Sequence, residues 1–407
     1  MTQEIKDTID NGNVAVGVFV DFQKAFDTVN HKILLSKLEH YGIRGVANDW
    51  FSSYLTNRQQ YVRIGNTNSH TKPILHGVPQ GSVLGPLLFL IYINDLNKCI
   101  HFSTTRHFAD DTNLLYTIDS YKLRNRNPTR KLNIDLKSLN HWLLANKISL
   151  NATKTELIYF RNQKKAIPHT KIILNRVKLT ENNQVKYVGV IFDKHLTFKS
   201  HIQLLNAKLK RANNLIAISR HYLAQKFLMQ IYYGQFYSHL TYGCQLWGQN
   251  ENAIKQTIAL QEKSIRLISF ASFEEDSSPL FKALNLLKLT DIVKQSNILF
   301  AHNSINNQTP HIFKDFFIVN KINHKHHTVN SLNSVYSMPA GSLELPTYRN
   351  NSGKLSTRYV CASAWNSTLK DLSMKNIEKY NSDPFWLNNT NINTVKHTLK
   401  KHFLEYY

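Results

Sequence analysis

The sequence has few cysteines and lacks a long hydrophobic run. Its three cysteines, Cys99, Cys244 and Cys361, lie too far apart for a zinc knuckle or a CxxC redox pair, and three is a poor number for a disulfide framework. The longest apolar stretch, residues 86–93, is far shorter than the roughly 20 residues that span a bilayer. Residues 1–13 are polar, unlike a signal peptide. We therefore expect an intracellular protein of the nucleus or cytoplasm, without a membrane partner.

Acidic residues are also scarce. The 407 residues include 50 lysines and arginines against 27 aspartates and glutamates, which gives a formal net charge of +23. Residues 1–130 hold 14 basic and 11 acidic side chains, so most of the positive excess lies in residues 131–407. Since each phosphate contact releases condensed counterions, this excess favours a polyanionic partner, with nucleic acid ahead of an anionic membrane surface.

The chain is too long for one hydrophobic core, and its pattern changes near residue 197. Residues 14–22 are almost continuously apolar and β-branched, which predicts a buried strand. Up to residue 195 the pattern predicts an α+β fold, and beyond residue 197 it predicts helices. In the first part we expect helices at 31–41, 46–55 (Val46, Trp50, Tyr54 and Leu55 inward), 86–96 and 131–145, a hairpin of 61–65 with 72–75, and strands at 106–109, 112–116, 155–160 and 185–192.

Three aspartates stand where a charge is unexpected. Asp21 ends the buried strand, while Asp110 and Asp111 occupy a turn between two short strands. Distant strands can be neighbours in an antiparallel sheet, and converging carboxylates repel each other unless divalent cations neutralise them. Mg²⁺ favours one or two carboxylates with waters and substrate phosphates, and two such ions could promote in-line phosphoryl transfer. The alternative is structural: Asp21 caps the next helix, and the pair satisfies a tight hairpin.

Five ordered motifs favour the catalytic interpretation. Residues 20–31 (VDFQKAFDTVNH), 76–86 (HGVPQGSVLGP) and 108–112 (FADDT) resemble the first palm motif, the second motif and the catalytic hairpin of reverse transcriptases from non-long-terminal-repeat (LINE-type, jockey-like) retrotransposons. Residues 150–156 (LNATKTE) and 185–190 (VKYVGV) resemble the next two motifs of that family. Lower-specificity similarity to segments that follow the polymerase in such elements occurs at 242–248, 260–266 and 363–366.

The resemblance implies a right-hand polymerase. The expected regions are a palm at residues 1–195, with an antiparallel sheet, helices and a remnant of the fingers, a helical thumb and connector at residues 196–289, and a mostly helical C-terminal region at residues 290–407. Because only 20 residues precede Asp21, we expect the fingers to be largely missing through N-terminal truncation.

The implied activity is that of an RNA-directed DNA polymerase, a nucleotidyltransferase. It would transfer dNTPs to the 3′-hydroxyl of a DNA primer on an RNA template, with two Mg²⁺ or Mn²⁺ ions. Two alternatives stay open. One is a catalytically inactive remnant that binds RNA or an RNA–DNA duplex, and the other is an RNA-dependent RNA polymerase, against which Phe26 and Ala109 argue.

The resemblance also implies which residues act in catalysis. Asp21, Asp110 and Asp111 would be the metal ligands, with the Phe22 carbonyl as an additional ligand. Lys154 would donate a proton to the departing pyrophosphate or offset its charge, unless it is simply an exposed lysine.

The remaining motif residues would position the substrates. Phe26 would collide with a 2′-hydroxyl and so favour deoxynucleotides, or else is a core aromatic. Gln80 and Gly81 would contact the template and the nascent base pair, with a plain turn glycine as the alternative. Tyr187, Val188 and Gly189 would form a hairpin that grips the primer. Lys208, Lys210 and Arg211 would contact the duplex phosphates from one stripe of a helix, and the alternative is that this stripe is only a solvated face.

Several histidines raise the question of zinc. His311, His324, His326 and His327 lie close in sequence, but no cysteine stands at knuckle spacing from them. We therefore expect a polar loop here and no zinc site.

Overall fold

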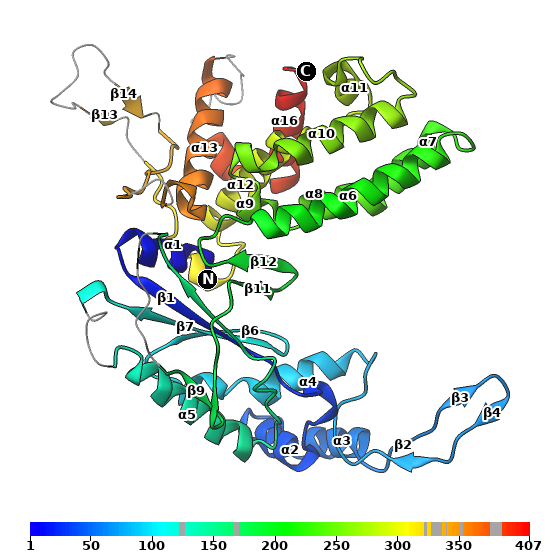
Figure 1. Cartoon of the computed structure of the whole chain (residues 1–407), viewed down its shortest axis with the longest axis vertical. Helices are drawn as coiled ribbons and strands as arrows, with labels where there is room; N and C mark the ends of the chain where they lie inside the picture. The colour runs from blue at the N-terminus through cyan, green and yellow to red at the C-terminus, as the bar shows by residue number, and fades with distance from the viewer. Residues whose placement is uncertain are drawn as a thin grey trace. The chain divides into compact units, whose positions relative to one another are not determined.

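The computed structural model describes residues 1–121, 127–163, 165, 171–320, 324–326, 336–338, 340–349, 353–374 and 385–407. They form two compact units, one of Gly12–Leu196 and one of Met1–Asn11 together with Thr197–Tyr407 (Figure 1). The first eleven residues thus belong to the unit that contains the C-terminus, whereas the expected palm included them. The division into palm, thumb and C-terminal region stays a prediction.

An antiparallel sheet forms the centre of the Gly12–Leu196 unit. Its strands lie in the order β6–β7–β1–β8, with the bounds Thr104–Phe108, Asp111–Ile118, Val14–Val20 and Glu156–Phe160. All seven residues of β1 are buried, in agreement with its continuous apolar sequence. The α+β class that the sequence predicts for this part of the chain is therefore confirmed.

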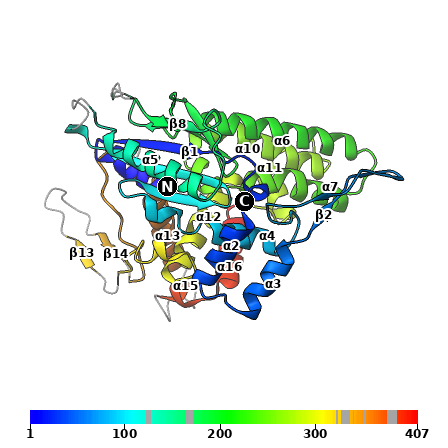
Figure 2. The ribbon, with the colours of Figure 1, turned by 90° about the horizontal axis from the view of Figure 1, so that it is seen from below.

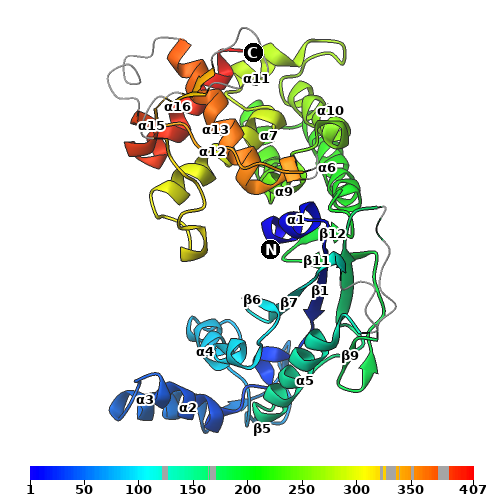
Figure 3. The ribbon, with the colours of Figure 1, turned by 90° about the vertical axis from the view of Figure 1, so that its left-hand side faces the viewer.

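One face of this sheet packs on helices. Side chains alternate across a strand, so every second residue of β1 points to the same face. On that face Val14, Val16 and Val18 enter a hydrophobic core with Leu114 of β7. The helices of this unit are α2 (His31–His40), α3 (Val46–Leu55), α4 (Leu84–Ile93) and α5 (Arg130–Ala145), and α5 runs along the sheet in Figure 3. The core includes the apolar stripe expected on α5, Leu132, Leu136, Leu139 and Leu143.

The short strands that follow α3 pair differently from the expected hairpin. β2 (Gln59–Gln60) pairs with β5 (Lys72–Pro73), and β3 (Arg63–Ile64) pairs with β4 (Thr67–Asn68). The predicted pairing of residues 61–65 with 72–75 is wrong, because Gly65, at a φ of 58°, begins a tighter turn and closes β3 on β4. In Figure 1 these exposed strands extend away from the sheet.

The orientation expected for α3 is wrong for Val46 and Trp50 only. Val46 and Trp50 are 87% and 54% exposed, and Leu55 alone among the residues of this helix is buried. The periodicity of α3 is helical as predicted, and Tyr54 packs half-buried against the core as expected. The remaining short elements of this unit are η1 (Ala25–Asp27), η2 (Leu96–Cys99), β9 (Ile173–Leu174), β10 (Val177–Lys178), β11 (Gln184–Tyr187) and β12 (Val190–Asp193).

The other unit is mainly helical. Its helices α6 (Lys199–Ser219) and α10 (Glu251–Ile268) lie side by side (Figure 2). Buried polar pairs join them: Thr257 donates a hydrogen bond of 2.8 Å to the Asn206 amide oxygen, and Ser264 donates to that of Asn213. Both pairs are 51 residues apart, so the two helices run parallel and in register. The apolar stripe predicted for α6 is confirmed, since Ile202, Leu205, Leu209, Ala212 and Ile216 are buried.

The rest of the described part of this unit consists of further helices and the hairpin of β13 with β14. Its remaining elements are α1 (Thr2–Asp10), α7 (Gln225–Ile231), the π-helix η4 (Tyr232–Tyr237), α8 (Ser238–Thr241), α9 (Cys244–Trp247), α11 (Ser277–Ala283), α12 (Leu289–Ile305), η5 (His311–Phe313), β13 (His324–His326), β14 (Tyr336–Met338), η6 (Gly353–Leu355), α13 (Thr357–Met374), α15 (Trp386–Asn389) and α16 (Ile392–Leu404). Among the described residues, no helix combines the length and apolar character needed to cross a bilayer.

Helix α1 is held to the late part of the chain by polar contacts. Gln3 donates a 2.8 Å hydrogen bond to the Tyr348 hydroxyl and accepts one of 3.0 Å from the Arg358 backbone. The Lys6 ammonium donates to the Leu355 carbonyl. Lys6 is only 7% exposed, and burial lowers its pKa from 10.5 to about 8. At neutral pH Lys6 is therefore charged in the folded protein, and the burial of this charge lowers the free energy of unfolding.

Replacing Lys6 by methionine tests this burial. Between pH 8 and 10.5 the unfolded chain holds more protons at Lys6 than the folded protein does, so the wild-type free energy of unfolding should rise with pH relative to Lys6→Met. The full change is on the order of 3 kcal/mol. Urea denaturation of both proteins at several pH values would measure it. A stability difference that does not vary with pH would contradict the buried charge.

Candidate active site

Asp21 and Asp111 come together where two neighbouring strands meet. β1 ends at Val20, β7 begins at Asp111, and Val20 pairs with Thr112. The next position along this antiparallel register places Asp21 opposite Asp111, and opposed residues point to the same face with their Cβ atoms about 5 Å apart. Because Val20 belongs to the hydrophobic core, Asp21 projects from the face opposite that core.

Asp110 lies in the adjoining turn. Phe108 pairs with Asp111, so Ala109 and Asp110 alone connect β6 to β7. Ala109 has a φ of 53°, a left-handed conformation that costs a residue with a Cβ about 1–2 kcal/mol. The turn exposes Asp110 next to Asp111, and backbone strain of this kind is commonly held at functional sites.

The three carboxylates influence one another. Partial burial raises the pKa of Asp111, and the charges of Asp110 and Asp21 raise it further. A hydrogen bond from the Val188 backbone N–H to the Asp111 carboxylate acts in the opposite direction. Mutual repulsion of this kind is relieved when a cation binds between the carboxylates.

The donor set fits a hard divalent cation. Within the described part of the chain, no three or more His, Cys, Asp or Glu side chains are grouped so that they could hold a metal ion alone. Mg²⁺ commonly takes only one or two carboxylates and completes its shell with waters and substrate phosphates. The opposed Asp21 and Asp111 are compatible with such an ion, and their role as ligands stays a prediction. The His324, His326 and His327 side chains lie outside the described residues, and the expected absence of a zinc site stays a prediction.

Residues 149–155 support Asp21 from the other side. Asn151 N–H donates to the Asp21 carbonyl at 2.9 Å, and Gln23 N–H donates to the Ser149 carbonyl at 2.9 Å. These bonds flank an antiparallel bridge between Phe22 and Leu150, so the Phe22 carbonyl points away from Leu150. That orientation leaves it available for the ligand role that the motif implies.

Lys154 lies on the same supporting segment. Its backbone N–H donates a 3.2 Å hydrogen bond to the Asn151 carbonyl, and its side chain is exposed. Lys154 therefore lies three residues after Asn151, whose backbone N–H binds the Asp21 carbonyl. Its chemical role stays a prediction.

The β11–β12 hairpin contacts the site directly. Tyr187 pairs with Val190, so Val188 and Gly189 form a two-residue turn, with φ values of 43° and 76°. Both values are positive, as in the type I′ turns of tight hairpins, and a β-branched residue such as Val188 is strained there. The Tyr187 ring packs edge-on against Phe19 of β1, with 5.4 Å between ring centroids. Burial, and then the Asp111 charge, raise the pKa of Tyr187.

Residues 185–192 are thus two strands rather than the single strand that the apolar pattern predicted, and they meet at the turn that the resemblance implied. Sequence reasoning missed how this hairpin meets the aspartates. The Val188 contact to Asp111 joins the motif at residues 185–190 to the catalytic hairpin. The Tyr-Val-Gly-Val sequence does carry a turn signal, because Gly189 follows an apolar strand pattern.

The first and second motifs also bind each other. Val78 N–H donates to the Phe26 carbonyl at 2.9 Å, and the Gln80 side chain donates to the Asp27 carboxylate at 2.7 Å. Gly77 permits this approach, since a Cβ there would lie 2.9 Å from the Asp27 Cα. The structure therefore brings Gln80 next to the motif that contains Asp21.

Phe26 and Gly81 have distinct environments. The half-buried Phe26 ring stacks on Phe89 of α4 at a centroid distance of 4.5 Å, so it also serves the core. Gly81 has a φ of 79°, and nothing lies within 4 Å of the position where a Cβ would be. A cleft of about 860 Å³ lies beside Gln80, and its lining includes Lys24, Asp27 and Arg58.

The family follows from comparison with known proteins. Residues 2–192 match the family described as "Reverse transcriptase (RNA-dependent DNA polymerase)". Residues 2–192 belong to the reverse transcriptase family. The chain is 30% identical over 333 residues to the probable RNA-directed DNA polymerase from transposon BS of Drosophila melanogaster, covering 75% of the present chain and 35% of that relative.

Other relatives agree with the predicted resemblance, which is confirmed. The polymerase from mobile element jockey of Drosophila melanogaster is 30% identical over 305 residues, covering 70% of this chain and 32% of that one. The probable polymerase from transposon X-element of the same fly is 26% identical over 310 residues, covering 72% of this chain and 33% of its own. This chain thus spans about a third of the length of these relatives. A telomerase structure from Candida albicans, at 14% identity and a TM-score of 0.32, is too distant to bear on the fold.

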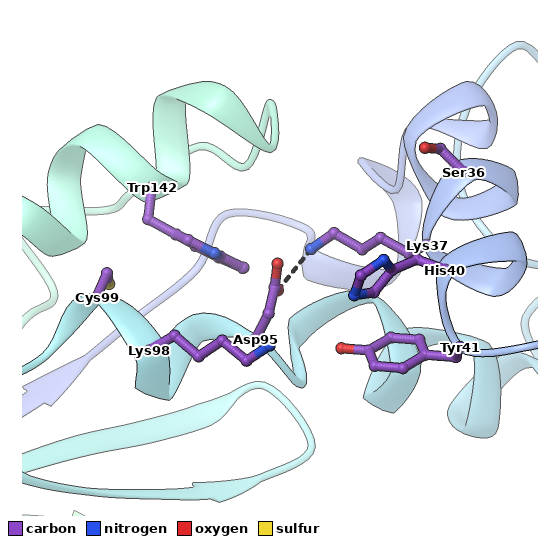
Figure 4. A pocket seen from close by; sticks show the side chains of 8 residues that line it. All are labelled: Ser36, Lys37, His40, Tyr41, Asp95, Lys98, Cys99 and Trp142. Carbon is purple, nitrogen blue, oxygen red and sulfur yellow. Dashed lines mark hydrogen bonds and ion pairs between the residues drawn. The ribbon is translucent and has the colours of Figure 1, made fainter.

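Three basic side chains and one pocket lie outside the group formed by the aspartates. Lys208, Lys210 and Arg211 are exposed on α6, in the other unit, and their phosphate contacts stay a prediction. A pocket of about 430 Å³ lies in the unit that carries the aspartates (Figure 4). Its lining residues are Ser36, Lys37, His40, Tyr41, Asp95, Lys98, Cys99 and Trp142.

Internal contacts already occupy the main groups of this pocket. Lys37 points to Asp95 and pairs with it at 2.7 Å, and its ammonium lies 4.9 Å from the Trp142 ring centroid (Figure 4). Burial raises the pKa of Cys99 to about 11, which keeps the thiol protonated and poorly reactive. We assign the pocket no chemical role.

Replacing Asp111 by asparagine should stabilise the protein without divalent cations. The change removes the repulsion from Asp21 and Asp110, while the amide oxygen can still accept from Val188 N–H. Because Asp111 is exposed and its charge is screened, we expect a gain of no more than about 1 kcal/mol. The gain should disappear as the pH falls and wild-type Asp111 becomes protonated.

Thermal denaturation in EDTA and in Mg²⁺ would measure both effects. Mg²⁺ should raise the melting temperature of the wild type more than that of Asp111→Asn, because only the former keeps both ligands. Asp49→Asn, a change at an exposed aspartate on α3, controls for the lost charge. A less stable Asp111→Asn protein in EDTA at neutral pH would argue against repulsion at this site.

Proposed function

We propose that this chain is the polymerase part of a non-long-terminal-repeat retrotransposon protein and adds dNTPs to a DNA primer on an RNA template. The observation that carries the proposal is the opposed placement of Asp21 and Asp111 at the junction of β1 and β7, with Asp110 in the adjoining turn. In this proposal Gly12–Leu196 is the palm, and the helices from Thr197 onward provide the thumb and the C-terminal region.

Asp21, Asp110, Asp111 and the Phe22 carbonyl hold the two catalytic cations in this proposal. Bound Mg²⁺ or Mn²⁺ lowers the pKa of the attacking 3′-hydroxyl and neutralises charge that develops on the leaving pyrophosphate. The residues of the chain fix the geometry, since the β1–β7 register and the Asn151 hydrogen bond both orient Asp21. Positioning supplies much of the rate in phosphoryl transfer, so these contacts matter for catalysis.

The other motif residues orient the substrates. Gln80, held by Asp27, and the open Gly81 contact the template and the nascent base pair. The Phe26 ring, fixed by its stack on Phe89, occupies the space that a ribonucleotide 2′-hydroxyl would need. Exposed Lys154 offsets the charge of the pyrophosphate or donates a proton to it.

Primer and duplex contacts complete the proposal. The turn at Val188 and Gly189 places backbone next to Asp111, where the primer terminus must lie for its hydroxyl to react. On α6, the exposed Lys208, Lys210 and Arg211 follow the phosphates of the RNA–DNA duplex.

Primer extension tests the enzyme proposal. With oligo(dT) on poly(rA) and Mg²⁺ or Mn²⁺, the wild-type chain should incorporate dTTP, whereas Asp110→Asn should lose at least about a hundredfold in rate because it lacks a cation ligand. Asp49→Asn should extend the primer as the wild type does. If none of the three proteins extends the primer while all bind the duplex, this chain is a binding remnant and the enzyme proposal fails.

Replacing Phe26 by alanine tests the sugar discrimination. The smaller side chain leaves room for a 2′-hydroxyl, so the preference for dTTP over UTP should fall by at least about tenfold, mainly through faster UTP incorporation. Loss of the stack on Phe89 also opens a gap in the core, which Phe26→Leu fills better and which therefore serves as the control. An unchanged dTTP-to-UTP ratio in an active Phe26→Ala enzyme would leave Phe26 as a core aromatic only.

A further inference from the structure

Helix α3 carries a column of stacked planar side chains. The Trp50 and Tyr54 rings are nearly parallel, with an interplanar angle of 9° and 5.6 Å between centroids. The Arg58 guanidinium lies 5.5 Å from the Tyr54 centroid and donates to the Tyr54 carbonyl at 3.4 Å. Phe51 packs edge-on against Trp50 at 5.0 Å and restricts its rotation. Trp50 and Tyr54 are four residues apart and are therefore neighbours on the surface of α3. Arg58 lies three residues beyond the end of the helix at Leu55.

Tyr54 packs half-buried against the core of its unit, whereas the two ends of the column, Trp50 and Arg58, are exposed. Trp50 is 54% exposed, and the nearby strands expose Tyr61 and Ile64 by 55% and 78%. Exposed aromatic side chains held in fixed positions are costly in water and commonly mark a binding surface.

The charge around the column favours a polyanion. Residues 44–80 contain four exposed basic side chains, Arg44, Arg58, Arg63 and Lys72, against one acidic side chain, Asp49. Stacked aromatic rings beside arginine, on a basic surface, match the way proteins bind single-stranded nucleic acid, because unpaired bases expose a π-face that a duplex hides. An apolar protein partner would gain little from these four cations.

The column continues into the candidate active site. Arg58, its last member, also lines the cleft of about 860 Å³ together with Lys24, Asp27 and Gln80. Gln80 is hydrogen-bonded to Asp27 within the first motif. A strand that stacks on Trp50 and follows Arg58 therefore arrives at the residue assigned to the template.

We propose that Trp50, Tyr54 and Arg58 form a stacking surface for the unpaired template strand before it is copied. This inference rests on the proposed polymerase function and extends it to a defined path for the template. A base stacks on the outer ring face of Trp50, and the Arg58 guanidinium contacts the phosphates at the entrance of the cleft.

Binding to primer–templates with and without a template overhang tests the surface. In the absence of dNTPs, an unpaired 5′ overhang of about six nucleotides should tighten binding of the wild-type chain over a blunt duplex. Trp50→Ala should reduce this gain about tenfold, the typical contribution of one stacked base, without changing the affinity for the blunt duplex. Fluorescence anisotropy with labelled oligonucleotides measures both affinities.

Matched variants separate stacking from charge and from misfolding. Trp50→Phe should keep most of the overhang gain, and Arg58→Lys should keep less than half, because lysine retains the charge but loses the planar stack. Tyr222→Ala removes an aromatic that is 84% exposed in the other unit and should leave the gain intact. Thermal denaturation of each variant shows whether α3 still folds.

The outcomes separate this inference from the enzyme proposal. If the overhang gain survives in Trp50→Ala and Arg58→Ala, the stacking surface is refuted even when primer extension succeeds. If no primer is extended but the gain depends on Trp50, the surface stands and the enzyme proposal fails for this chain. If the wild-type chain sediments as a dimer and Trp50→Ala as a monomer, with RNA binding unchanged, the face is a protein interface and the inference is overturned.

Discussion

The pairing of Val20 with Thr112 decides whether Asp21 and Asp111 face each other. A slip of one residue between β1 and β7 would turn one carboxylate toward the helices, since side chains alternate along a strand. The hydrophobic core prevents this slip, because Val16, Val18 and Leu114 must all stay on the helix side. The apolar side chains on one face of the sheet thus maintain the geometry of the acidic side chains on the other.

The site itself is a local source of instability. Ala109 and Val188 both have left-handed φ values, and Asp111 is repelled by its neighbours. The Val188 N–H bond to Asp111 links these unfavourable features, so that each turn is held partly by the other. Such strain persists only where the surrounding structure determines it, and here β1, buried along its whole length, provides that support. The trade-off between stability and function is typical of catalytic centres.

Much of the architecture could be predicted from local pattern. The strand at residues 14–20 and the stripes of α5 and α6 follow the burial period of their elements, and the five motifs identify the family. The pairing of β2 with β5 and the exposure of Trp50 could not be predicted, because both depend on which other segments come close. For the site, sequence reasoning selected the aspartates, but the Val188 contact depends on tertiary structure and left no pattern in the sequence.

The polar contacts of α1 have a consequence for the order in which the protein folds. Gln3 and Arg358, which bond to each other, are 355 residues apart, and the whole Gly12–Leu196 unit lies between them. During translation α1 leaves the ribosome long before its partners, while the unit between them can already bury its core. Completion of the second unit must therefore wait for a late, long-range closure, and in that interval the polar and apolar faces of α1 are available to chaperones.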